Sequence, residues 1–155
     1  MVLWLSFAIL GIEIWGGIAA GSLALLSDAG HVFGDILAVT TNIVVEEAVR
    51  RGRPERRFRS WGGYVNAAVL FAVALGIVFE ALGRWAHPLE VKSGMMITVA
   101  VLGALGNLAQ HRILSSSQAH HVTHKGMRLH VLSDLWQSIA VIVAGIVIAA
   151  TGLTI

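Results

Sequence analysis

Five long apolar runs constrain this chain more than any other feature of its sequence. They cover approximately residues 3–20, 23–45, 62–82 and 94–114, and a last stretch that begins after Ser117 and ends near Ala150. A helix needs about 20 apolar residues to cross the hydrocarbon core of a bilayer, whereas a barrel strand needs about ten residues of alternating hydrophobicity. The runs are too long for such strands. The sequence therefore predicts an all-α, polytopic transmembrane helix bundle with five spans, and the Gly21-Ser22 step predicts a tight turn between the first two.

Composition supports this prediction and excludes several classes of protein. Hydrophobic residues make up 56% of the chain and charged residues 13%, against about 25% charged residues in an ordinary soluble domain. This balance excludes a disordered chain, a soluble enzyme and a nucleic-acid-binding module. The chain has no cysteine, which excludes disulfides and thiolate metal sites. No basic leader precedes the first run, so we expect it to be a membrane span and not a cleaved signal peptide.

Basic residues are distributed unevenly between the predicted loops. The segment between the second and third spans holds six arginines, and the segment after the fourth span holds Arg112, Lys125 and Arg128. The segment between the third and fourth spans holds only Arg84 and Lys92. Lysine and arginine accumulate in cytoplasmic loops of membrane proteins. We therefore expect a multi-pass protein of the cell membrane, with its N-terminus in the cytoplasm and its C-terminus outside.

Ionisable residues inside the apolar runs mark the candidate functional site, because a charge at mid-membrane is costly unless it is paired or hydrated. The second run contains His31 and Asp35, and the fifth contains His130 and Asp134. In each pair the aspartate follows the histidine by four residues, which places both side chains on one face of a helix. Two imidazoles and two carboxylates suit a tetrahedral divalent ion, and this donor set favours zinc.

The balance of charge supports a metal site that also binds protons. A divalent cation with two aspartates is formally neutral, whereas two buried carboxylates without the ion repel each other, so the empty site should take up protons. A site that accepts either metal or protons has the properties of a cation/proton exchanger. The alternative interpretation is that each pair is a helix-packing device, hydrogen-bonded across an interface. The presence of two matching pairs favours metal binding.

At these residues the chain resembles the cation diffusion facilitator family, whose members export zinc and related divalent ions in exchange for protons. The sequence GSLALLSDAGH at residues 21–31, with Asp35 after it, is similar to the second-helix signature of the family. The sequence LHVLSD at residues 129–134 is similar to the fifth-helix signature. The resemblance covers nearly the whole chain. It implies that the four ligands of the transport site are His31, Asp35, His130 and Asp134.

The resemblance also implies a substrate, partners and a domain organisation. Zinc is the expected transported substrate, with cobalt, cadmium or iron as alternatives, and no organic cofactor is expected. The expected partners are divalent metal ions, protons, the lipid bilayer and a second copy in a homodimer, but no nucleic acid. Residues 1–155 are expected to form a transmembrane domain equivalent to the first five helices of a six-helix domain, with no soluble C-terminal domain among them.

Two other functions remain open at this point. One is a truncated, non-transporting subunit or fragment that binds metal and works with a partner. The other, less favoured, is an intramembrane zinc metalloenzyme. A catalytic zinc keeps one coordination position open for water, whereas four protein ligands would close it. We therefore expect a transporter and not an enzyme.

Five other polar residues are candidates for accessory roles. The resemblance implies a histidine-bearing loop, here His120, His121 and His124, that collects metal before delivery; the alternative is a solvated loop that binds nothing in particular. Asp28 precedes the first ligand histidine by three residues and extends its polar stripe along the helix. Glu13 lies midway along the first span. It either belongs to a proton or water path or, when protonated, donates a hydrogen bond to a neighbouring helix.

Overall fold

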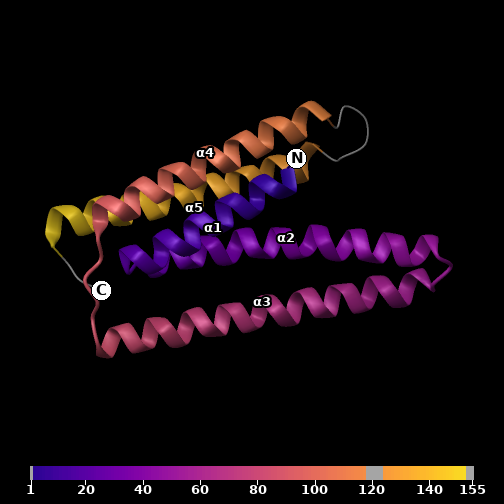
Figure 1. Cartoon of the computed structure of the whole chain (residues 1–155), viewed down its shortest axis with the longest axis horizontal. Helices are drawn as coiled ribbons and strands as arrows, with labels where there is room; N and C mark the ends of the chain where they lie inside the picture. The colour runs from indigo at the N-terminus through magenta and orange to yellow at the C-terminus, as the bar shows by residue number, and fades with distance from the viewer. Residues whose placement is uncertain (1, 118–123, 153–155) are drawn as a thin grey trace.

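The computed structural model describes residues 2–117 and 124–152, and these residues form five α-helices without any strand. The structure confirms the predicted all-α bundle, and α1, α3, α4 and α5 each contain a stretch long and apolar enough to cross a membrane. The second helix is also long enough to cross a membrane, but it is less apolar because its interior carries the ionisable residues described above. In chain order (Figure 1), the helices are α1 (Val2–Ala20), α2 (Leu23–Arg50), α3 (Glu55–Ala86), α4 (Ser93–Ser117) and α5 (His124–Thr151).

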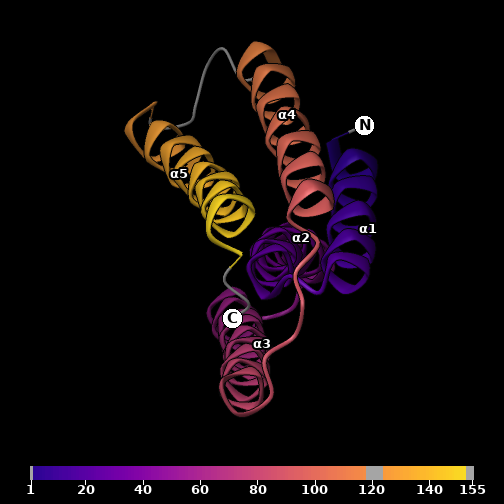
Figure 2. The same ribbon diagram turned by 90° about the vertical axis from the view of Figure 1, so that its left-hand side faces the viewer.

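The helix α2 occupies the centre of the arrangement. It packs against α1 on one side and α3 on the other, while α4 packs against both α1 and α5. Figure 2 shows α3 on one side of α2 and the group α1, α4 and α5 on the other. Among the described residues, α3 packs against α2 alone, and its most apolar stretch has no buried residue. In a membrane such a surface lies against lipid, so its exposure is compatible with a stable bundle.

A tight turn joins α1 to α2, as the sequence predicts. Gly21 has a φ of +66°, a conformation that side-chain-bearing residues rarely adopt. The Ser22 hydroxyl then accepts a hydrogen bond from the Leu25 backbone N–H at 3.3 Å and caps the first turn of α2. The buried guanidinium of Arg84, in the last turn of α3, donates to the Gly21 carbonyl and, at 3.0 Å, to Glu80. We call this region the Gly21 end of the bundle.

The opposite end of α2 and α3 carries the arginine-rich segment. Both helices extend beyond their predicted apolar spans there, α2 as far as Arg50 and α3 from Glu55 onward. Arg51 donates to Glu47 at 2.7 Å and Arg59 donates to Glu55 at 2.8 Å, both within exposed helical turns. Such pairs at a spacing of four stabilise helical ends that have no apolar face to bury.

The apolar core lies between α1, α2, α4 and α5 near the Gly21 end. Leu25, Met96 and Ala100 have at most 1% of their surface exposed there. A second cluster, formed by Ile9, Val32 and Ile36, joins α1 to α2 farther along the bundle. These two clusters hold α2 against α1. A neighbouring face of α2 is directed toward α5.

Candidate metal centre

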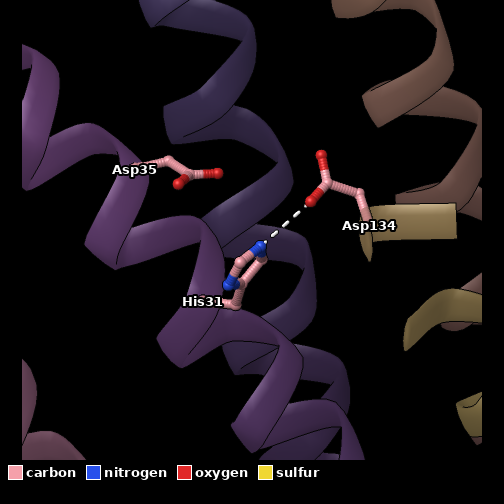
Figure 3. A group of neighbouring side chains, drawn as sticks. All are labelled: His31, Asp35 and Asp134. Carbon is pink, nitrogen blue, oxygen red and sulfur yellow. Dashed lines mark hydrogen bonds and ion pairs between the residues drawn. The ribbon is translucent and has the colours of Figure 1, made fainter. Parts of the chain in front are cut away.

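Three of the four predicted ligands lie together where α2 approaches α5. One potential ligand atom from each of His31, Asp35 and Asp134 lies within 4.8 Å of the other two. The His31 Nε2 atom is 3.0 Å from Asp134 Oδ1, and Figure 3 shows His31 and Asp35 extending from α2 toward Asp134 on α5. All three side chains are half-buried. In the described part of the chain, this is the one group of three or more such residues able to hold a metal ion.

The local sequence of α2 explains how it presents these ligands. The spacing of four places His31 and Asp35 on the face directed toward α5. Gly30 and Gly34 alternate with them and lie on the face directed toward α3. A Cβ atom on Gly34 would lie only 2.8 Å from the side chain of Leu70. The glycines therefore let α3 pack closely on one side of α2 while the ligands occupy another.

The arrangement is already close to the geometry that zinc requires. In a tetrahedral site with bonds of 2.0–2.1 Å, neighbouring ligand atoms are about 3.3 Å apart. The observed 3.0 Å between His31 Nε2 and Asp134 Oδ1, with Asp35 within 4.8 Å, requires only small side-chain movements. One imidazole and two carboxylates would form a formally neutral site with a divalent cation. His31 also lies about 12 Å along α2 from its first residue, well inside the bundle.

The fourth predicted ligand, His130, lies in α5 and precedes Asp134 by one helical turn. Helical spacing places the two residues on one face of α5, but the side chain of His130 lies outside the described part of the structure. Its role as a ligand therefore stays a prediction. The same applies to the metal-collecting loop, because His120 and His121 lie outside the described residues and His124 is described only as the first residue of α5.

A second polar contact joins α2 to α5 beside the ligands. Asp28 is 2% exposed, and its Oδ1 atom accepts a hydrogen bond of 2.9 Å from Gln137 Nε2. Asp28 thus contacts α5 close to the ligand group, and its accessory role in the site stays a prediction. Gln137 is not among the predicted site residues. Its spacing of three from Asp134 was the available signal, since that spacing places both on one face of α5.

Glu13 is fully buried between α1 and α4. Its carboxylate lies against Gly103 of α4, where an added Cβ atom would force the Glu13 side chain to shift. Neither carboxylate oxygen has a hydrogen-bond partner among the described residues, and the predicted hydrogen bond to a neighbouring helix is not present there. Glu13 interacts electrostatically with Asp28 and His31. Glu13 is not a member of the group of three potential ligands.

Comparison with known proteins identifies the family of this chain. The model of the cation efflux transmembrane domain matches residues 1–155, the whole chain. The chain belongs to the cation efflux family, also called the cation diffusion facilitators. It is a membrane protein, and its relatives are metal transporters.

Three cation diffusion facilitators of similar sequence carry names that describe the metals they transport. The chain is 35% identical to the zinc transporter ZitB of Escherichia coli K12 over 150 residues, which are 92% of this chain and 48% of that protein. It is 38% identical over 148 residues to the metal cation efflux system protein CzcD of Cupriavidus metallidurans, covering 90% and 46%. It is 32% identical over 149 residues to a cadmium, cobalt and zinc/H(+)-K(+) antiporter of Bacillus subtilis, covering 91% and 48%. The chain thus spans about half the length of the curated relatives it matches.

Proposed function

We propose that this chain forms the ion-binding membrane domain of a transporter that exports zinc in exchange for protons. The observation that carries this proposal is the convergence of His31, Asp35 and Asp134 from two helices inside the bundle. A mixed set of nitrogen and carboxylate donors favours zinc over magnesium or calcium, which prefer oxygen ligands alone. Relatives named for zinc, cadmium and cobalt support the same class of ion as substrate.

The contact between His31 and Asp134 supplies a physical basis for exchange. When His31 is protonated, its Nε2–H group can donate a hydrogen bond to Asp134 Oδ1, which lies 3.0 Å away. Zinc binding needs the lone pair of that nitrogen, so an imidazolium at His31 must release one proton to water before the ion is coordinated. The reverse step, protonation of the same group, weakens the hold on zinc and favours its release. Metal and proton therefore compete for one pair of atoms, which is one of the requirements for antiport.

The proposal also includes the orientation of the chain in the membrane, its accessory polar residues, the histidine loop and the homodimer. We infer that the arginine-rich end faces the cytoplasm, together with the N-terminus. Asp28 and Glu13 are accessory polar residues outside the ligand set, either in a proton path or in helix packing, and the burial of both side chains supports an accessory role. The histidine loop and the homodimer stay predictions from the resemblance. A closed shell of four protein ligands favours a transporter over a metalloenzyme.

Zinc binding should release protons, and calorimetry can count them. We expect the purified chain in detergent to bind one zinc ion at its tight site and to release about one proton or more per ion. The measurement compares binding enthalpies in two buffers of equal pH and different ionisation enthalpy. A Ser133→Ala variant, changed at an exposed residue next to Asp134, should release the same number. Tight zinc binding without proton release would contradict exchange at this site.

A further inference from the structure

The two polar contacts between α2 and α5 are stacked along the helices. Leu23, at the start of α2, and Ile148, near the end of α5, line the same pocket at the Gly21 end, so the two helices run in opposite directions. Asp28 precedes His31 by three residues, and Gln137 follows Asp134 by three. Both steps lead toward the Gly21 end and advance about 4.5 Å along the axis. The Asp28–Gln137 contact therefore lies about one turn from the His31–Asp134 contact.

The packing of the bundle makes the Asp28–Gln137 contact important for the position of α5 relative to α2. The main packing partner of α5 is α4, and those of α2 are α1 and α3. The helices that carry the ligands are thus held mainly by other neighbours, and they approach each other over a short stretch. Hydrogen bonds cross that stretch at His31–Asp134, 3.0 Å, and at Asp28–Gln137, 2.9 Å.

The two contacts differ in what metal binding does to them. Coordination of an ion replaces the His31–Asp134 hydrogen bond, because both of its atoms become ligands. The Asp28–Gln137 hydrogen bond uses no ligand atom, so it can persist whether the site holds metal or protons. Asp28 is buried, and a hydrogen bond to a carboxylate shielded from water is stronger than one between neutral, solvated groups.

We propose that Asp28 and Gln137 are a positioning pair, which holds α5 at the distance from α2 at which Asp134 can share an ion with His31 and Asp35. This inference rests on the proposed function of that site. The acceptor role of Asp28 is separate from its charge, since an asparagine amide oxygen can accept the same hydrogen bond. Residues that orient ligands without touching the metal commonly change its affinity by 10–100-fold.

The experiment measures zinc affinity in Gln137→Leu, Asp28→Leu and Asp28→Asn variants of the whole chain by competition with a chelating dye. We expect Gln137→Leu and Asp28→Leu to weaken binding about tenfold or more. Asp28→Asn, which keeps an acceptor for Gln137, should remain within about threefold of the parent. The thermal unfolding midpoint of each metal-free variant identifies any general loss of folding.

The outcomes separate this inference from the proposed function. If the parent chain has no tight site that depends on Asp134, the proposed function itself fails. If the parent binds zinc tightly and Gln137→Leu binds equally well, the positioning pair is wrong while the site stands. If Asp28→Asn loses as much affinity as Asp28→Leu, the charge of Asp28 matters instead of its hydrogen bond, which also overturns the inference. Full affinity in Asp28→Asn with losses in both leucine variants supports it.

Discussion

Replacement of Asp134 by alanine is expected to weaken zinc binding about 100-fold or more. Structural zinc sites with four ligands have apparent binding free energies of about 10–16 kcal/mol, so one ligand accounts on average for about 3 kcal/mol. Asp134 also supplies one of the two negative charges that balance the ion. Its Oδ1 atom lies 3.0 Å from His31 Nε2, and its removal leaves α5 without a carboxylate at the site.

The affinity is measured by competition with a chelating dye in detergent, with Ser133→Ala as the matched control. Ser133 is the preceding residue of α5 and is exposed, so its substitution should leave the affinity within about twofold of the parent. Parent-like zinc affinity in Asp134→Ala would show that the three converging side chains are not the tight site.

Replacement of His130 by alanine is expected to weaken the same site by a similar factor, although its side chain lies outside the described part of the structure. His130 precedes Asp134 by four residues in α5, a spacing that brings two residues onto one face of a helix. The three converging side chains provide one nitrogen and two carboxylates, which leaves one position of a tetrahedral shell for a second imidazole.

His124 offers a matched control on the same helix, since it is also a histidine and lies at the start of α5. We expect His124→Ala to leave the affinity of the tight site within about twofold, because six residues separate it from His130 and carry it to another face and level of the helix. The opposite pattern, loss in His124→Ala and none in His130→Ala, would assign the fourth ligand to the predicted histidine loop.

Hydropathy predicts four of the five helices, because α1, α3, α4 and α5 each contain a stretch that is long and apolar enough to cross a membrane. It does not predict their full length. The last turn of α2 and the first turns of α3 are held by pairs such as Arg51–Glu47 and Arg59–Glu55, which depend on charge and spacing. The polar residues of α2 lower its hydropathy, but their common face identifies it as a helix that lines a site.

Local spacing and the family resemblance together predict the ligand residues of the candidate site, but they do not predict its other contacts. The interval of four residues places His31 beside Asp35 within one helix, but no interval predicts that α2 meets α5 across 103 residues of sequence. The resemblance supplies that pairing. The Asp28–Gln137 contact and the burial of Glu13 against Gly103 depend on how neighbouring helices pack, so they emerge from the structure alone.

We propose that α2 and α5 hold one zinc ion through two histidines and two aspartates. Zinc K-edge X-ray absorption of the one-to-one complex tests it most directly. We expect four nitrogen or oxygen ligands at about 2.0–2.1 Å, with multiple scattering from two imidazoles in the parent and from one in His130→Ala. A six-coordinate oxygen shell, or a parent spectrum without imidazole scattering, would contradict it.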